Sequence, residues 1–186
     1  MSLSSGCSFR CAFCTVPTQI TAVSPKRLLA DVDALSALSF GLVFVDDKSF
    51  GQASNWGLLA RVREMICDRS EEVYGFIVQT PPSIAARPGF LEKCYEMGVR
   101  YVEFGVETVD DALLKWLQKP FSVMHRRRAC AIARDLGIYV VPNLIIGIPG
   151  DIYSGSIEWL EDNVDIVPVV NVNWLAVHHG NDIDAR

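Results

Sequence analysis

Three cysteines close to the beginning of the chain have the clearest capacity for chemistry. Cys7, Cys11 and Cys14 follow the spacing C-x3-C-x2-C, so one short loop can direct three thiolates at a single metal centre. A structural zinc site needs four protein ligands, and a ferredoxin-type cluster needs a fourth cysteine. The nearest further sulfur is at Cys67, and the only histidines of the sequence are His125, His178 and His179. Three thiolates alone favour an iron–sulfur cluster with one open iron over a zinc site or a metal-free reactive loop.

The elements that must position these cysteines alternate between helices and strands. Apolar stripes at helical spacing predict helices over residues 55–68, 89–97, 110–118, 122–136 and 157–164, and one that starts at Pro25 and ends before Gly41. Short apolar runs predict buried strands over residues 42–45, 73–78, 99–106, 138–146 and 171–177. The glycines that end three helices, at positions 41, 98 and 137, suit a left-handed residue after each helix.

Serial alternation of this kind argues for a parallel sheet with helices outside, either as an open doubly wound sheet or as a barrel. In both layouts, ligands bind at the carboxyl ends of the strands. Acidic, glycine and histidine residues gather at these ends: Asp46, Asp47, Glu107, Thr108, Gly147, Gly150, His178 and His179.

The segment around the cysteines resembles the signature of the radical S-adenosylmethionine (SAM) enzymes. Residues 6–14 read GCSFRCAFC and match C-x3-C-x-aromatic-C. Four further segments resemble, in order, motifs of the branch whose members often carry a cobalamin-binding domain and of its methylthiotransferase-like relatives. They are FVDDKSF (44–50), VEFGVET (102–108), Lys119-Pro120 and NLIIGIPG (143–150). The resemblance extends over nearly the whole chain.

This resemblance implies a fold and a reaction. The fold is a partial (β/α)6 TIM-like barrel, with the first strand truncated because only residues 1–5 precede the cysteine motif. The chemistry is reductive cleavage of SAM by a [4Fe-4S] cluster to a 5′-deoxyadenosyl radical, which acts on a substrate that the sequence does not identify. An electron donor such as flavodoxin or ferredoxin is implied. Any cobalamin would bind through a domain outside this chain.

The resemblance also assigns roles, each beside a simpler alternative. Cys7, Cys11 and Cys14 would ligate the cluster. Phe13 would pack near adenine, or only plug the loop. Asp46 or Asp47 would accept from the SAM ammonium, or cap a turn.

Further along the chain, Glu107 would bind the ribose or ammonium of SAM, and Thr108 beside it would belong to the same SAM site. Alternatively, the two residues would serve the start of the helix near Asp110. Lys119 would pair with the SAM carboxylate, or be a surface lysine. Asn143 would bind the ribose, or bond to backbone inside the barrel. Gly147, Ile148 and Pro149 would lie against adenine, or form a plain turn.

Three other features favour structural interpretations. The basic run at residues 125–128 is expected to be a solvated helix face, and His178 and His179 are expected to lie in a surface loop. Cys67, Cys94 and Cys130 fall in helical segments and are expected to be small buried hydrophobes.

Composition limits the remaining possibilities. The 186 residues predict a single domain, which is expected to be the core of a longer protein, and residues 1–3 are interpreted as a cloning scar. A net charge of −5 opposes binding to nucleic acid. The chain has no long apolar run, so we expect no membrane-spanning helix and no signal peptide. Its cysteine usage favours a reducing cytoplasmic location. The competing hypotheses are a non-catalytic iron–sulfur or zinc module, and a barrel domain that serves as a substrate-binding or assembly piece of a larger enzyme.

Overall fold

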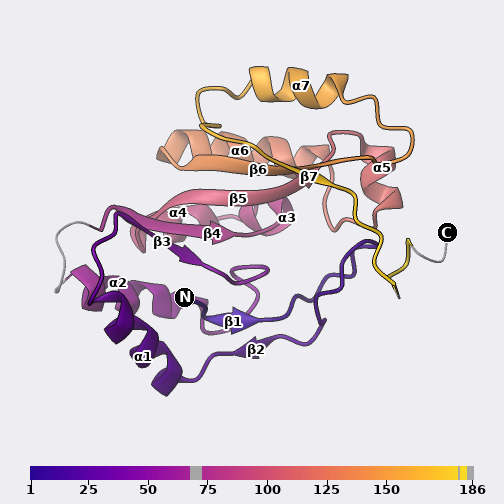
Figure 1. Cartoon of the computed structure of the whole chain (residues 1–186). Coiled ribbons are helices and arrows are strands. Elements are labelled where there is room, and N and C mark those ends of the chain that lie inside the picture. Colours follow the sequence, from indigo (N-terminus) through magenta and orange to yellow (C-terminus); the bar gives the residue numbers. More distant parts are fainter. Residues whose placement is uncertain (68–72, 180, 184–186) are drawn as a thin grey trace.

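Five parallel strands form the central sheet of the protein. The computed structural model describes residues 1–67, 73–179 and 181–183. The strands are hydrogen-bonded in chain order and curl into a half-barrel (Figure 1). They are β3 (Leu42–Val45), β4 (Gly75–Gln79), β5 (Val99–Glu107), β6 (Tyr139–Ile146) and β7 (Asn171–Trp174). All four pairings between neighbours are parallel, which confirms the predicted sheet.

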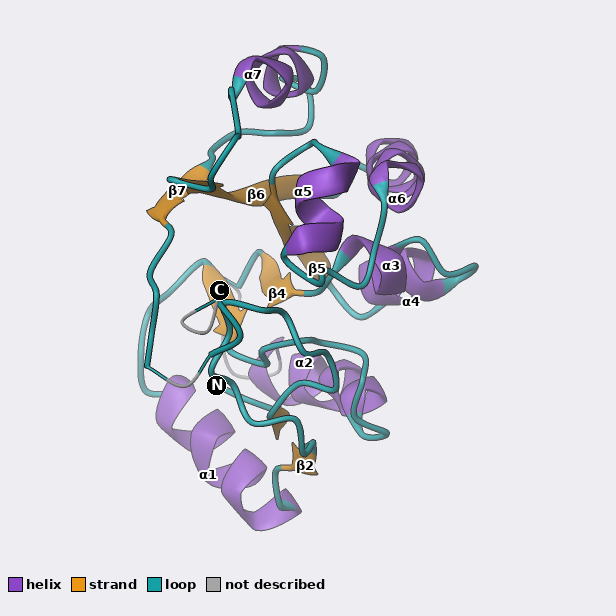
Figure 2. Ribbon diagram, turned by 90° about the vertical axis from the view of Figure 1, so that its right-hand side faces the viewer, coloured by secondary structure: helices purple, strands orange, loops and turns teal. Residues whose placement is uncertain are grey.

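Most helices cover the convex outer face of this sheet, as Figure 2 shows, whereas α5 (Asp111–Trp116) lies at the carboxyl ends of the strands beside the cysteine loop. The other helices are α1 (Pro25–Leu35), α2 (Leu59–Cys67), α3 (Pro82–Ala85), α4 (Phe90–Glu96), α6 (Val123–Leu136) and α7 (Ser154–Glu161), with a short 3-10 turn, η1 (Trp56–Leu58), before α2. Among the described residues, none of these helices combines the length and the apolar character needed to span a bilayer.

The strands separate an apolar outer face from a more polar inner face. In β5, Val102, Phe104 and Val106 are buried against the helices. Because side chains alternate along a strand, Glu103 and Gly105 point to the opposite, concave side. The concave side of the half-barrel is therefore where polar groups from several strands can meet.

The residues before the cysteine loop run beside β3 but form no full strand of the sheet. The Met1 amino group donates to the Phe44 carbonyl oxygen (3.1 Å), and the Asp46 amide donates to the Met1 carbonyl oxygen (2.8 Å). Beyond this point, β1 (Ser4–Ser5) turns away and pairs antiparallel with β2 (Thr21–Ala22). In the described part of the chain, the main sheet thus has five strands and a short first-strand segment along its edge.

Most predicted elements are present, and four of them differ from their predicted bounds by three or more residues. Helix α1 ends at Leu35, where the Ser36 amide closes the last turn, so Gly41 does not cap it. Helix α7 begins three residues earlier than predicted, because its first turn is built from the small residues 154–156, which carry no apolar stripe. Strand β7 stops at Trp174 instead of residue 177. The predicted helix over 55–68 opens with the 3-10 turn, and its last residue lies outside the described residues.

Two glycines and one proline show how local chemistry sets element ends. Gly98 and Gly137 have positive φ angles of 91° and 69°, which confirms their predicted role after α4 and α6. Pro82 begins α3, because a proline in the first helical turn needs no amide donor.

Candidate metal and cofactor site

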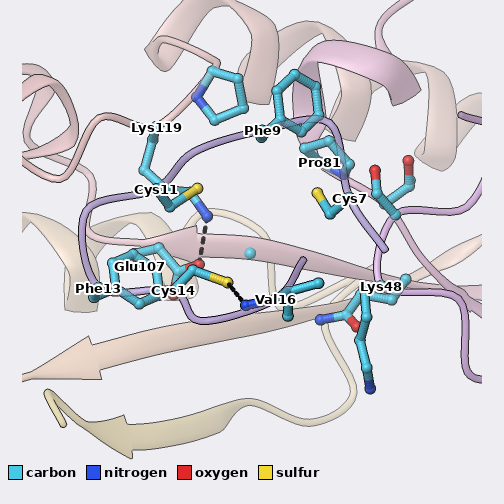
Figure 3. A pocket seen from close by; sticks show the side chains of 15 residues that line it. Cys7, Phe9, Cys11, Phe13, Cys14, Val16, Lys48, Pro81, Glu107 and Lys119 are labelled. Carbon is cyan, nitrogen blue, oxygen red and sulfur yellow. Dashed lines mark hydrogen bonds and ion pairs between the residues drawn. The ribbon is translucent and has the colours of Figure 1, made fainter. Parts of the chain in front are cut away.

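The three thiols of the cysteine motif line one cavity at the carboxyl ends of β3, β4 and β5. Figure 3 shows Cys7, Cys11 and Cys14 around this cavity of about 170 Å³. All three are free thiols. Other predicted residues on its wall are Phe13, Glu107 and Lys119. The structure therefore brings together six residues that the sequence singled out.

Backbone hydrogen bonds fold the cysteine loop into this shape. The Cys7 amide donates to the Pro17 carbonyl oxygen (2.9 Å), and the Cys14 amide donates to the Cys11 carbonyl oxygen (3.0 Å). Gly6 has φ +81°, and a Cβ atom there would lie 2.0 Å from the Gln19 carbonyl oxygen. Only glycine fits at this crossing of the two arms of the loop.

Two side chains that follow β3 anchor the arm that carries Cys7. Asp47 is 1% exposed, and one of its carboxylate oxygens accepts from the Leu3 amide (2.7 Å) and the Ser4 amide (2.9 Å). Its other oxygen accepts from the Ser4 hydroxyl (2.6 Å). The Gln52 side-chain oxygen accepts from the Ser8 amide (2.8 Å). Asp47 thus holds the entry to the loop and does not line the cavity.

A buried ion pair lies on the other side of the cavity. Lys119 Nζ and Glu107 Oε1 are 2.7 Å apart, and each side chain is 8% exposed. Burial has the largest single effect and lowers the pKa of Lys119, but the charge and hydrogen bond of Glu107 together with Cys11 and Cys14 outweigh it, so the pKa is raised. Lys119 Nζ also lies 5.4 Å from the centre of the Phe13 ring. The cavity therefore contains a fixed positive charge with a carboxylate partner.

The end of β5 has an unusual backbone that makes this ion pair possible. The pairing register with β6 shifts between Gly105 and Glu107, and Glu107 has a left-handed φ of 62°. A Cβ atom at Gly105 would lie 2.7 Å from Glu107 Oε1 and 3.2 Å from Lys119 Nζ. The left-handed backbone conformation of Glu107 costs about 1–3 kcal/mol in a non-glycine residue, and such conformations are concentrated at functional sites.

Arg126 and Thr108 support this strand end from outside the cavity. Arg126 Nη1 donates to the Thr108 carbonyl oxygen (3.3 Å), and its guanidinium lies 5.3 Å from the Trp159 ring centre. Thr108 is fully buried, and its hydroxyl accepts a hydrogen bond from the Asp110 amide (3.3 Å), while the Asp110 side chain itself caps α5. The expected solvated basic face is wrong for Arg126, which is buried because α7 packs over it.

The donor set fits an iron–sulfur cluster with an open position. Three thiols and no histidine line the cavity, so it offers three sulfur ligands. In the described residues, no three His, Cys, Asp or Glu side chains converge tightly enough for a single metal ion. Burial raises the pKa of the Cys11 thiol, while the Lys119 charge opposes this shift. A polynuclear cluster accepts more widely spaced thiolates than a mononuclear zinc site does.

A second hollow, of about 320 Å³, adjoins the first on the concave face. It shares Phe13, Gln79 and Glu107 with the cysteine cavity and extends to Asn143 and His178. Cross-strand hydrogen bonds organise its floor: Asn171 Nδ2 donates to Asn143 Oδ1 (2.9 Å), and both amides bond to Glu103. Burial raises the pKa of Glu103, and these hydrogen bonds oppose it.

The remaining predicted residues lie outside both hollows. Asp46 forms an exposed ion pair with Lys48 (2.6 Å). Gly147 has φ +90°, and its amide donates to the Tyr153 hydroxyl (2.7 Å). Ile148 is buried in a small apolar cluster that Phe13 also contacts, and Pro149 follows it. Cys94 and Cys130 are buried as predicted, whereas Cys67 is exposed, because it ends its helix.

Four residues that line the cysteine cavity were not among the predicted site residues. Ser49, Gln79, Thr80 and Pro81 reach it from the ends of β3 and β4. Their position directly after predicted strands could have indicated them, since ligands collect at strand carboxyl ends.

Comparison with known proteins agrees with this geometry. Residues 1–161 match the family model described as the radical SAM superfamily. The chain belongs to the radical SAM superfamily. Two curated relatives are methylases: the hopanoid C-3 methylase of Methylococcus capsulatus is 28% identical over 152 residues, and the hopanoid C-2 methylase of Rhodopseudomonas palustris is 27% identical over 187 residues.

Solved structures share the radical SAM fold. Methylornithine synthase superposes with a TM-score of 0.76 at 16% identity, over 100% of this chain and 55% of that one. The radical SAM methyltransferase TsrM from Kitasatospora setae, with cobalamin and a [4Fe-4S] cluster bound, superposes with a TM-score of 0.74 at 17% identity, over 98% of this chain and 38% of that one.

The two hopanoid methylases align over 78% and 92% of this chain but only 28% and 34% of their own lengths.

Proposed function

We propose that this chain binds a [4Fe-4S] cluster through Cys7, Cys11 and Cys14 and cleaves SAM reductively. The observation that carries the proposal is that three free thiols, and no fourth sulfur or imidazole, line one cavity beside a buried lysine. When bound, the cluster would pass one electron to SAM, breaking a carbon–sulfur bond to give methionine and a 5′-deoxyadenosyl radical. A ferredoxin or flavodoxin would supply that electron.

In this proposal the chain's own residues bind and orient SAM. Lys119 attracts the SAM carboxylate, and Glu107 holds Lys119 in place and accepts from the ammonium or ribose. Phe13 lies between the two hollows and offers an apolar surface to adenine. Asn143, on the floor of the second hollow, bonds to the ribose. Partial burial of these groups strengthens each of these polar contacts.

Other predicted contacts have less support. Asp47 is fully engaged with Leu3 and Ser4, so we assign it to positioning the cysteine loop. Contacts of SAM with Asp46, Thr108, Gly147, Ile148 and Pro149 stay predictions, because these residues line neither hollow.

Anaerobic reconstitution with iron and sulfide tests the proposal. The protein should become brown, bind SAM, and release 5′-deoxyadenosine when dithionite is added. Alanine at Cys7, Cys11 or Cys14 should abolish cluster assembly, whereas Cys67→Ala, at an exposed cysteine outside the cavity, should not. Zinc binding without colour would support a zinc module. A cluster that ignores SAM would support a non-catalytic iron–sulfur module or an assembly domain.

A second proposal concerns the complete protein. Both curated relatives are methylases, and TsrM carries cobalamin, so we propose that the complete protein is a methylase with cobalamin in a domain outside this chain. Transfer of a labelled methyl group from SAM by the longer protein, dependent on added cobalamin, tests it. A cytoplasmic location is part of the proposal, since oxidation would damage an open cluster and its thiolates.

A further inference from the structure

The Ser49 hydroxyl is a buried polar group of the cysteine cavity that the proposed SAM contacts do not use. Ser49 is 3% exposed and lines the same cavity as the three cysteines. Its Oγ atom has no hydrogen-bond partner among the described residues. A buried hydroxyl without a hydrogen-bond partner is unfavourable, so this group favours a hydrogen-bond partner that enters the cavity.

The connections of its segment place Ser49 on the Cys7 side of the cavity. Asp47, two residues before it, holds Leu3 and Ser4 at the entry to the loop. Gln52, three residues after it, binds the amide of Ser8, which is next to Cys7.

Figure 3 agrees with this placement. It shows Lys48 and Pro81 near Cys7, while Lys119, Glu107 and Phe13 surround Cys11 and Cys14. The buried ion pair of Lys119 and Glu107 thus lies beside Cys11 and Cys14, whereas Lys48, the residue before Ser49 in the chain, lies on the Cys7 side.

The loop already directs one donor at a cysteine sulfur. The Val16 amide donates to Cys14 Sγ at 3.4 Å. No comparable bond to the sulfur of Cys7 or Cys11 is present among the described residues. A neutral hydroxyl is well suited to the Cys7 side, because it donates to a thiolate or sulfide without adding charge.

We propose that the Ser49 hydroxyl donates a hydrogen bond to cluster sulfur on the Cys7 side, either the Cys7 thiolate or an adjacent sulfide, and thereby sets the reduction potential of the cluster. Ser49 is a positioning and tuning residue for the electron-transfer step. The inference rests on the proposed cluster. A hydrogen bond to sulfur stabilises the more negative, reduced state, so it raises the potential.

The test is the midpoint potential of the reconstituted cluster, measured by anaerobic redox titration with electron paramagnetic resonance detection and no SAM present. In Ser49→Ala, the ratio of reduced to oxidised cluster at a fixed potential should fall about tenfold, which is a negative shift of about 59 mV for one electron. Ser83→Ala is the matched control, because the Ser83 hydroxyl is also buried without a partner but does not line the cavity. Its potential should equal that of the parent.

A second pair of variants covers a Ser49→Ala protein that does not assemble the cluster. Ser49→Thr keeps the hydroxyl and Ser49→Val replaces it with a methyl group of similar shape, so the valine variant should titrate at the lower potential. Equal midpoint potentials of Ser49→Ala and Ser83→Ala overturn the inference, and so do equal potentials of Ser49→Thr and Ser49→Val. So does an unchanged potential combined with weaker SAM binding, which would assign the hydroxyl to SAM. Failure of the parent itself to take up iron and sulfide would instead overturn the proposed function.

Discussion

Neutralising Lys119 should destabilise the protein far more than neutralising a lysine in an exposed pair of the same length. Lys119→Met retains most of the apolar stem that lies near Phe13 and Phe121 but leaves the Glu107 carboxylate buried without its cation. The chain supplies its own control, because Lys48 and Asp46 are 2.6 Å apart with side chains 46% and 53% exposed.

The structure sets the expected magnitudes. Breaking a buried pair by removing one partner costs about 3–5 kcal/mol, since an uncompensated charge remains in a medium of low dielectric constant. An exposed pair contributes at most about 1 kcal/mol, since water screens both groups. Lys119→Met should therefore lower the free energy of unfolding more than Lys48→Met does, and the two losses should differ by at least about 2 kcal/mol.

Urea denaturation of the reduced, metal-free protein, followed by circular dichroism, measures this difference. With a typical slope of about 2 kcal/mol per molar urea, the Lys119→Met midpoint should fall by about 2 M. Adding Glu107→Gln to that variant should restore much of the loss, because it removes the unpaired charge. Equal effects of the two lysine variants would refute the electrostatic argument, and so would a double variant no more stable than Lys119→Met.

Three further predictions concern other parts of the site and core. The pKa of Glu103 is raised, so the folded protein keeps the Glu103 proton to a higher pH than the unfolded chain does. The stability that this group contributes is therefore lost as the pH rises above about 4.3, the ordinary pKa of a glutamate. Glu103→Gln should thus gain stability over the parent from pH 4 to pH 7 in urea titrations, and a constant difference would contradict this. Burial raises the pKa of the Cys94 thiol to about 12 and that of Cys130 to about 11, so mass spectrometry after alkylation at pH 8 should find both unmodified until urea is added. Gly6→Ala should lower iron uptake and cost more stability than Gly150→Ala, since both positions have positive φ but only Gly6 also meets a backbone oxygen; equal losses would show that the close contact is unimportant.

The short-range features of this protein could be predicted from its residues in order. The C-x3-C-x2-C spacing identified the loop, and the alternation of apolar segments identified all five strands of the sheet. The glycines at 98 and 137 marked helix ends correctly. These signals are local, because helix periodicity, strand alternation and glycine conformation depend on neighbouring residues in the chain.

The chemical surroundings of the loop depended on contacts between distant residues. Asp47 follows β3 and Glu107 is the last residue of β5, yet Asp47 secures the backbone of Leu3 and Ser4 while Glu107 turns into the cavity toward Lys119. A register shift at the end of β5 makes this difference, and no local pattern encodes it.

Burial was decided in the same way, by how the elements pack. Arg126 lies in a basic run that reads as solvated, but it is enclosed once α7 brings Trp159 over it. Ser49 is an ordinary polar residue after a strand until the segment that follows β3 closes one side of the cavity. The sequence thus determined which residues could hold a metal centre. Only the curled sheet determined which charges and hydroxyls surround it, because that depends on where separate strands end in space.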